Sequence, residues 1–360
     1  MNTLSTPDNP ESVKRWLPGF FALALIWGAS FLFIKIGVRE LHPFYVTLGR
    51  VAAGAITLLI ALAVLRQRLP RDPRLWLHMI VVAGIGTVIP FTLFGYGEQR
   101  VSSMLAGIWN ATTPLMVLPL SVLAFRTERM TGRKAAGFGL GFLGVLVVLG
   151  VWRGVGGVEL TGQLMCLGAA FCYGLVIPYQ KRFVAGRPES GLALSAAQLV
   201  VGTAQLAIVA PLVAGAPPAP TRLSLDVIAS VLALGALGTG IAFVINMRNI
   251  RIAGASTASM VTYLVPVFAV VFGALALDER LAWYQPVGAV IVLAGVAVSQ
   301  GLVPARRRPD RAAPEPDPAA PPTEPAAPEP DTDRPANGRG AGQVTAAAAT
   351  VRAPRAATRR

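Results

Sequence analysis

The chain has 360 residues, of which 54% are hydrophobic and only 14% charged, and its mean hydropathy is +0.58. Soluble domains carry about 25% charged residues, so this composition argues against a water-soluble globular enzyme. The 32 basic and 18 acidic residues leave a net charge of +14. Such an excess fits either a nucleic-acid-binding protein or a membrane protein whose basic residues gather in short loops on one side.

Long apolar stretches recur along the chain, each near the ~20 residues that a helix needs to cross ~30 Å of hydrocarbon. Ten of them lie at residues 17–37, 44–65, 75–96, 102–125, 134–152, 160–181, 192–214, 226–247, 255–277 and 283–302. Most are apolar on all faces, as expected of helices surrounded by lipid or by other helices. They are too long for strands and lack the alternation of a membrane barrel. The sequence therefore predicts an all-α integral membrane protein with ten transmembrane helices.

The two ends of the chain differ from the apolar middle. Residues 1–16 form a polar N-terminal segment, and the stretch at 17–37 lacks a small-residue cleavage pattern, so we expect a first helix and not a removed signal peptide. From residue 303 the chain is rich in proline and alanine and has no aromatic residue, which predicts a disordered C-terminal tail over 303–360. A solvated tail or an electrostatic tether to anionic lipid would each account for its arginine-rich end.

Basic residues are distributed unevenly between the two sides of the predicted bundle. An even number of spans places both termini on one side, which carries 18 Lys and Arg residues against six on the other. The larger set is Lys14, Arg15, Arg66, Arg68, Arg71, Arg74, Arg126, Arg129, Arg133, Lys134, Lys181, Arg182, Arg187, Arg248, Arg251, Arg306, Arg307 and Arg308, and the smaller is Lys35, Arg39, Arg100, Arg153, Arg222 and Arg280. By the positive-inside rule we expect a multi-pass protein of the cell membrane with both termini cytoplasmic. The basic excess then reflects topology, and no folded basic domain indicates a nucleic-acid partner.

The sequence also repeats itself at an offset of 151 to 152 residues. The matching positions are Glu128-Arg129, Gly137, Gly144 and Gly150 with Glu279-Arg280, Gly288, Gly295 and Gly301, then Pro114 with Pro266 and Gly86-Thr87 with Gly238-Thr239. The chain therefore divides into two five-helix units, 17–152 and 153–302. Because five is odd, the second unit enters the membrane in the opposite orientation, and such inverted repeats are typical of secondary transporters.

This doubled pattern resembles the two EamA domains of the drug/metabolite transporter superfamily. The run Trp27-Gly28-Ala29-Ser30-Phe31 is similar to that family's first-helix motif, and Arg50-Val51-Ala52-Ala53 is similar to its second-helix arginine segment. The likeness covers residues 17–302 and implies a ten-helix carrier, often an exporter of metabolites, amino acids or toxic compounds. The second repeat has Gln198 roughly where the first has Arg50, a divergence that prevents transfer of a substrate.

Two charged residues near the outer half of the first unit are candidates for a role in transport. Arg50 lies about one turn inside the second span, where a charge costs at least ~2–3 kcal/mol at the bilayer centre. It could bind an anionic substrate, pair with Glu98, or extend to the outer interface and bond loop carbonyls. Glu98, near the end of the third span, is either a carboxyl that takes up a coupling proton or a solvated loop residue.

Glu128 and Glu279 occupy equivalent positions in the two repeats, on opposite faces of the membrane. Each lies just before a predicted helix, where a carboxylate can accept hydrogen bonds from free backbone amides and interact favourably with the helix dipole. We interpret both as structural caps, or as gates paired with the adjacent arginine, in preference to substrate contacts.

A cavity near mid-membrane is predicted where prolines interrupt the fourth and ninth spans. Pro114 and Pro266 remove helix hydrogen bonds, and the freed carbonyls could line a substrate site or belong to a packed kink. Polar and aromatic side chains within the spans would complete an amphipathic cavity suited to a neutral or zwitterionic solute. The full candidate set is Trp27, Ser30, Arg50, Tyr96, Asn110, Thr113, Pro114, Tyr173, Asn246, Thr262, Tyr263 and Pro266.

The sequence predicts transport without catalysis. There is no P-loop for ATP and no histidine cluster for a metal, so we expect no cofactor, and coupling to a proton or ion gradient. The expected partners are a small-molecule substrate and the lipid bilayer, and pairing of two copies as a homodimer is left open. One alternative is a nucleotide-sugar or sugar-phosphate carrier of the same superfamily, which should have more than one cation at its cavity. Another is a membrane receptor, which needs no inverted repeat, or an intramembrane enzyme, which needs clustered His, Asp or Glu.

Overall fold

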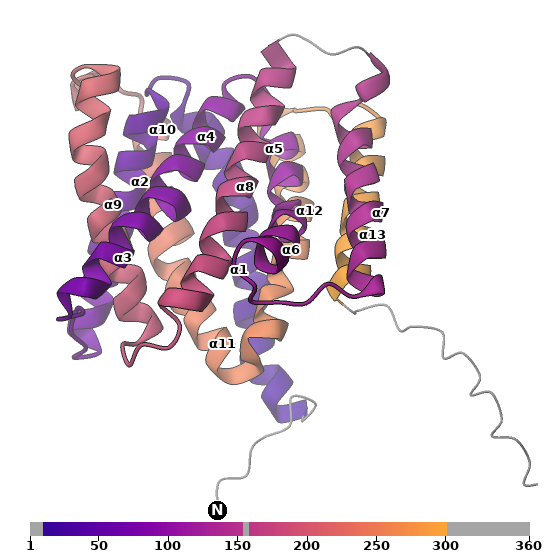
Figure 1. Cartoon of the computed structure of the whole chain (residues 1–360). Coiled ribbons are helices and arrows are strands. Elements are labelled where there is room, and N and C mark those ends of the chain that lie inside the picture. Colours follow the sequence, from indigo (N-terminus) through magenta and orange to yellow (C-terminus); the bar gives the residue numbers. More distant parts are fainter. Residues whose placement is uncertain (1–9, 154–157, 301–360) are drawn as a thin grey trace, which may run out of the picture. The chain divides into compact units, whose positions relative to one another are not determined.

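The computed structural model describes residues 10–153 and 158–300, and within those ranges the chain forms helices and short connections without a strand (Figure 1). The helices are α1 (Pro10–Gly37), α2 (Pro43–Val64), α3 (Pro73–Ala83), α4 (Ile89–Glu98), α5 (Ser103–Asn110), α6 (Thr113–Leu123), α7 (Gly132–Leu149), α8 (Val158–Phe183), α9 (Gly191–Ala214), α10 (Leu225–Gly235), α11 (Ala242–Ser259), α12 (Val261–Leu277) and α13 (Tyr284–Gln300). The all-α prediction is confirmed for these ranges. The predicted tail, 303–360, lies outside the described residues, as do residues 1–9 of the predicted N-terminal segment.

Short polar residues set where several helices begin. The side chains of Ser102, Thr131 and Ser190 accept hydrogen bonds from backbone amides two or three residues into α5, α7 and α9. These residues satisfy donors that a helix leaves free in its first turn. At α2 and α3 the side chains of His42 and Asp72 accept in the same way, and a proline also occupies the first turn, where its missing N–H costs nothing.

Eight helical segments are long and apolar enough to cross a membrane, and they begin with the one at Arg15–Gly37 and end with the one at Leu225–Ala253. The two remaining apolar helices, α12 and α13, have 17 residues each. Of the ten spans that the sequence predicts, eight are supported by the length and composition of their helices. Spanning by α12 and α13 stays a prediction.

Several predicted spans are interrupted helices. The third consists of α3 and α4 joined by a π-helical turn, η1 (Gly84–Val88), and the eighth contains a second π-helical turn, η4 (Ala236–Ile241). The fourth breaks between α5 and α6, where the Thr112 hydroxyl donates to the Trp109 carbonyl at 2.7 Å. A π-turn leaves one backbone group out of the regular ladder, and such turns are frequent at functional sites. The loop expected at 248–254 is instead helical, within α11.

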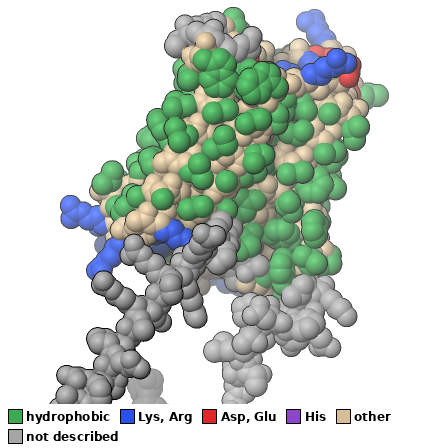
Figure 2. Space-filling view, turned by 90° about the vertical axis from the view of Figure 1, so that its right-hand side faces the viewer, with side chains coloured by type: hydrophobic (Ala, Val, Ile, Leu, Met, Phe, Trp, Pro, Cys, Tyr) green, Lys and Arg blue, Asp and Glu red, His purple; other side chains and the backbone are tan. Residues whose placement is uncertain are grey.

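The bundle has two ends that we name by the helices found there. The terminal end holds the start of α1 and the end of α13, and the opposite end holds the end of α1 and the start of α8 (Figure 1). Side chains between the ends present apolar surface, for example Leu77 at 66% and Leu275 at 82% exposure. Figure 2 shows hydrophobic side chains over most of one face, with Lys and Arg near its two ends. This is the surface that a lipid bilayer covers.

The last helices of the two sequence repeats, α7 and α13, pack against each other. A Cβ added at Gly144 would lie 2.6 Å from the Val292 amide nitrogen, and one added at Gly288 would lie 2.6 Å from that of Val148. Glycine at these positions lets the two backbones approach closely, which strengthens packing where lipid gives no hydrophobic drive.

Candidate functional site

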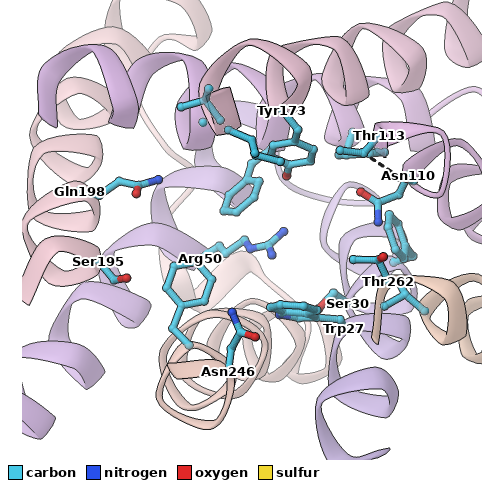
Figure 3. A pocket seen from close by; sticks show the side chains of 18 of the residues that line it. Trp27, Ser30, Arg50, Asn110, Thr113, Tyr173, Ser195, Gln198, Asn246 and Thr262 are labelled. Carbon is cyan, nitrogen blue, oxygen red and sulfur yellow. Dashed lines mark hydrogen bonds between the residues drawn. The ribbon is translucent and has the colours of Figure 1, made fainter. Parts of the chain in front are cut away.

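A cavity of about 400 Å³ lies inside the bundle, walled by α1, α2, α4, α5, α6, α8, α9, α11 and α12. Its wall is mostly apolar and aromatic, with hydroxyl and amide groups distributed around it (Figure 3). The lining residues are Trp27, Ser30, Phe31, Ile34, Arg50, Gly86, Phe91, Phe94, Asn110, Thr113, Tyr173, Val176, Ile177, Gln180, Ser195, Gln198, Phe243, Asn246, Met247, Thr262 and Val265.

The structure brings together most of the side chains that the sequence singled out for a cavity. Eight of them line it: Trp27, Ser30, Arg50, Asn110, Thr113, Tyr173, Asn246 and Thr262. They come from helices in both sequence repeats, as the view in Figure 3 shows. The other four, Tyr96, Pro114, Tyr263 and Pro266, are absent from the lining.

The four that lie elsewhere have identifiable surroundings. The Tyr96 hydroxyl and His42 Nε2 are hydrogen-bonded at 3.2 Å near the opposite end. Pro114 occupies the first turn of α6, just after the break, and lies beside Glu128 in a smaller cavity. Pro266 is buried inside α12, which continues through it. A proline can therefore follow a helix break or sit within a helix, and its position in the sequence alone does not separate the two.

Arg50 is fixed by two contacts with other helices. Its Nε donates to Thr239 Oγ1 at 3.0 Å, and its guanidinium carbon lies 3.7 Å from the centre of the Phe91 ring. The side chain is 8% exposed, so it does not extend to the membrane interface, and no ion pair joins it to Glu98. Of the three alternatives that the sequence left open, a cation facing the cavity fits this geometry (Figure 3).

The second repeat contains a matching contact. Gln198, on α9, donates from Nε2 to Thr87 Oγ1 at 2.8 Å, and it also accepts from Gln180. Thr87 and Thr239 are equivalent in the two repeats, and each lies in a π-helical turn. Arg50 therefore reaches from the first repeat to Thr239 in the second, while Gln198 reaches from the second repeat to Thr87 in the first. These two contacts place a cation, Arg50, and a neutral amide, Gln198, in the wall of the cavity.

At the opposite end, Glu279 forms hydrogen bonds with the start of α5, which lies far from it in the sequence. Its carboxylate accepts from the Ser103 amide at 2.9 Å, the Ser103 hydroxyl at 2.7 Å and the Met104 amide at 3.2 Å. It thus caps α5, in the other sequence repeat, and not the helix that follows it. The expected use of free amides is found, but at a different helix from the one that the sequence indicated.

Glu128, at the equivalent position of the first repeat, has different partners. Lys134 lies 2.7 Å and Lys181 3.5 Å from its carboxylate oxygens, and Thr131, not Glu128, caps α7. The hydrogen bond from Lys134 lowers the pKa of the Glu128 carboxyl below its usual value. The adjacent Arg129 does not appear among its ion-pair partners, so the expected pairing with the neighbouring arginine is not found.

The cavity reaches toward the terminal end. Gln180 lies near the end of α8, Ser195 near the start of α9 and Met247 beyond η4, and all three keep some exposure. At the opposite end, Glu98 and Ser103 are completely buried. The arrangement therefore offers an amphipathic chamber with one lining cation, which reaches toward the terminal end, and buried side chains at the opposite end.

Some lining residues were not anticipated from the sequence. Gln180 and Ser195 lie within a turn or two of helix ends, where polar residues usually face solvent. Thr239 does not line the cavity but accepts from Arg50, and the sequence indicates it only as a repeat position. The available signal for Thr239 was its match to Thr87, since each follows a glycine, Gly86 or Gly238, at equivalent positions of the two repeats. That signal could have shown equivalence, but not the contact with Arg50.

Comparisons with known proteins identify relatives of this chain among transporters. The EamA-like transporter family matches residues 14–150 and again residues 160–300. A Bacillus subtilis protein named "Uncharacterized transporter YoaV" is 27% identical over 282 residues, covering 77% of this chain and 94% of that protein. A Salmonella typhimurium protein named "Probable amino-acid metabolite efflux pump" is 26% identical, covering 78% of this chain and 94% of that protein.

A solved structure shares the fold. It is described only as a crystal structure of a protein, and it superposes with a TM-score of 0.57 at 19% identity, covering 82% of this chain and 99% of that chain. At this identity the likeness supports the helical architecture and carries no information on substrate.

Proposed function

The chain belongs to the EamA-like transporter family, and on that premise we propose that it is a secondary carrier that exports small amphipathic metabolites, such as amino acids, by alternating access. Its substrates would carry an apolar or aromatic part and a single anionic group. Both termini would be cytoplasmic, with the terminal end facing the cytoplasm.

The observation that carries this proposal is the composition of the cavity. Arg50 is the single cation among the described lining residues, and no Asp or Glu lies among them. A carboxylate would gain charge-assisted hydrogen bonds from its guanidinium. Trp27, Phe91 and Tyr173 provide aromatic surface for the rest of the solute, and Asn110 and Asn246 provide amides for polar groups. Such a wall would hold the carboxylate of an amino acid at Arg50 and leave its ammonium group to amide oxygens and aromatic faces.

Alternating access is supported by the relation between the two halves. The family matches the chain twice, and α1 and α8, the first helices of the two matches, run in opposite directions in Figure 1. The exchanged contacts Arg50–Thr239 and Gln198–Thr87 join the two repeats around the cavity. Two similar units in opposite orientation can exchange conformations, giving states open to each side with similar energies. The described conformation would be the one that receives substrate from the cytoplasm.

A carrier of nucleotide sugars or sugar phosphates is less well supported. These solutes bear two or more negative charges, and each phosphate favours its own cationic partner. Lys35 and Lys181, which would be the additional cations, do not line the cavity.

The proposal is tested by flux measurements with the purified chain in proteoliposomes. A panel of radiolabelled amino acids, their precursors and multiply charged nucleotide sugars would be presented with and without a pH gradient. We expect gradient-sensitive flux of at least one amino acid and none of the nucleotide sugars. Absence of flux across the panel from a folded, reconstituted protein would overturn the carrier proposal, and flux of nucleotide sugars alone would overturn the substrate class.

A further inference from the structure

Glu98 is a buried carboxyl without a hydrogen-bonding partner. It is the last residue of α4, at the opposite end of the bundle, and it is 0% exposed. Neither Oε1 nor Oε2 accepts or donates a hydrogen bond within the described part of the chain. It does not line the cavity, so the transport site described above leaves it unused.

Close packing of α4 against α8 keeps Glu98 from water. A Cβ added at Gly97 would lie 2.5 Å from Cys166 Sγ, and one added at Gly162 would lie 2.7 Å from the Arg100 Cβ. The two glycines therefore let the end of α4 and the start of α8 meet directly, with no room for a solvating water layer between them. The burial of Glu98 is thus a consequence of backbone packing.

The charged groups around Glu98 come from four parts of the chain. Lys35 of α1 is the nearest cation, Arg50 of α2 is a second, Glu279 is a neighbouring acid, and Cys166 of α8 is a neighbouring thiol. Lys35 does not pair with the carboxylate. Its Nζ donates instead to the backbone carbonyls of Glu98 and, at 2.7 Å, of Val101.

An ionised carboxylate in this position would be poorly compensated. Burying a charge without hydrogen-bond donors costs several kcal/mol, whereas a neutral carboxylic acid is buried at much lower cost. The Lys35 ammonium group donates instead to backbone carbonyls that the end of α4 leaves without helical partners. A small movement of this break would turn the same ammonium group toward the carboxylate.

We propose that Glu98 is a proton-binding site that holds a proton while the opposite end is closed and releases it when that end opens. This deepens the proposed function by naming the residue whose protonation favours closure of the opposite end. The proton leaves to that side and returns from it, so the site makes closure depend on the pH there. On opening, the O–H bond of the acid breaks and the proton passes to water entering from the opposite side. The carboxylate left behind accepts from the Lys35 ammonium, which gives up its bonds to the two carbonyls. On closing, the same steps run in reverse and a proton is taken up from that side.

The test measures opening of the opposite end as a function of pH. Ile34 lines the cavity on α1, one residue before Lys35, and is 3% exposed, so Ile34→Cys reports when water reaches the cavity from the opposite side. An impermeant maleimide would be added from the side opposite the termini between pH 5.5 and 8.5, with the chain lacking Ile34→Cys as the background. The labelling rate, corrected for intrinsic thiol ionisation, should rise with pH by up to about tenfold per unit, the limit for one linked proton.

Substitutions then assign the proton to Glu98. Glu98→Gln copies the protonated acid, so its labelling should stay low and lose the pH dependence. Glu159→Gln makes the same change at an exposed residue at the start of α8 and should keep the parent profile. Lys35→Gln removes the alternative partner and should shift the rise in labelling to higher pH. Gel filtration of each variant would establish that it is folded.

The outcomes separate the two proposals. Labelling that is flat with pH in the parent, or a Glu98→Gln profile that follows the parent, would overturn the proton site. A parent that transports solute with flat labelling removes the Glu98 inference alone. A parent that transports nothing but shows pH-linked labelling removes the transport proposal alone.

Discussion

Substitutions at Arg50 can separate the contribution of its charge from that of its shape, because its two contacts depend on the planar guanidinium group and not only on the positive charge. Lysine would keep the charge but lose the Nε bond to Thr239 and the planar stacking on Phe91. We expect Arg50→Ala to weaken substrate affinity by about tenfold to a hundredfold, as for loss of a charged hydrogen bond, and Arg50→Lys to restore only part of it. Concentration-dependent flux in proteoliposomes measures both.

Arg74→Ala serves as the matched control, since Arg74 is exposed at the start of α3, away from the cavity. Unchanged affinity in a folded Arg50→Ala chain would remove Arg50 from substrate binding. A loss for neutral substrates equal to that for anionic ones would instead assign Arg50 to the structure of the cavity wall.

Glu128 carries a pH dependence whose sign follows from its surroundings. The hydrogen bond from Lys134 lowers the pKa of its carboxyl in the folded chain. The stabilisation is therefore fully present above the carboxyl's unfolded pKa of about 4.3, and is lost as the pH falls through the lower folded value. The pair is partly exposed to solvent, so screening limits its contribution to about 0.2–1 kcal/mol.

Thermal unfolding in detergent at pH 7 and at pH 3 would measure this contribution. Glu128→Gln should lower stability at pH 7, and its effect should shrink at pH 3 as the pH approaches the lowered pKa of the parent carboxyl. Asp278→Asn, on the exposed residue that precedes Glu279, controls for the general effect of removing a carboxylate. An equal loss at both pH values would mean that Glu128 contributes through packing and not through its charge.

At the scale of helices, the contact between Glu279 and the start of α5 joins the two sequence repeats at the opposite end. Glu279→Ala would leave the buried amides of Ser103 and Met104 without acceptors, which costs about 1–3 kcal/mol. We expect a lower unfolding temperature and faster maleimide labelling of Ile34→Cys from the opposite side.

Arg280→Ala is the control, because Arg280 is the exposed neighbour in the same loop. If Glu279→Ala destabilises the chain without changing labelling, the residue is a helix cap only. If it changes labelling at unaltered stability, the contact acts mainly on the position of the opposite end.

The sequence predicted helix type and approximate position well, but not the interruptions within helices. Length and hydropathy located the apolar stretches because a bilayer imposes both. The π-helical turns at Thr87 and Thr239 and the break at Thr112 depend on how neighbouring helices pack, which no local pattern records. The helical stretch at 248–254 was mistaken for a loop because its Arg248 and Arg251 mimic the charged connections elsewhere.

For the candidate site, the sequence likewise predicted which residues take part but not how they contact one another. Polar and aromatic residues inside the apolar stretches indicated the cavity, and eight of the twelve candidates, among them Asn110 and Asn246, line it. Contacts such as Arg50 with Thr239 join residues 189 apart and could not be read from spacing. Likewise, the partners of Glu128 and Glu279 differ although their sequence contexts match, because the helices near each end of the bundle are packed differently.

For the molecule as a whole, the repeat and the charge distribution lead to a prediction about access to the cavity. The cavity reaches the terminal end near Ser195, while the loop between α9 and α10 at the opposite end exposes Ala219. With the terminal end in the cytoplasm, an impermeant thiol reagent added to intact cells should label Ala219→Cys and spare Ser195→Cys. Inside-out vesicles should reverse the pattern.

The same labelling experiment can be repeated in the presence of substrate. A solute that binds beside Arg50 occupies the chamber that Ser195 lines, so it should slow labelling of Ser195→Cys and leave Ala219→Cys unchanged. Labelling of Ser195→Cys from outside intact cells would mean that the described conformation is not the resting one or that the termini are extracellular. Labelling of Ala219→Cys distinguishes these two explanations, because it reports the orientation of the chain independently of the state of the cavity. Protection of Ala219→Cys in intact cells would mean that the termini are extracellular. Labelling of Ala219→Cys together with Ser195→Cys would mean that the resting carrier is open to the outside.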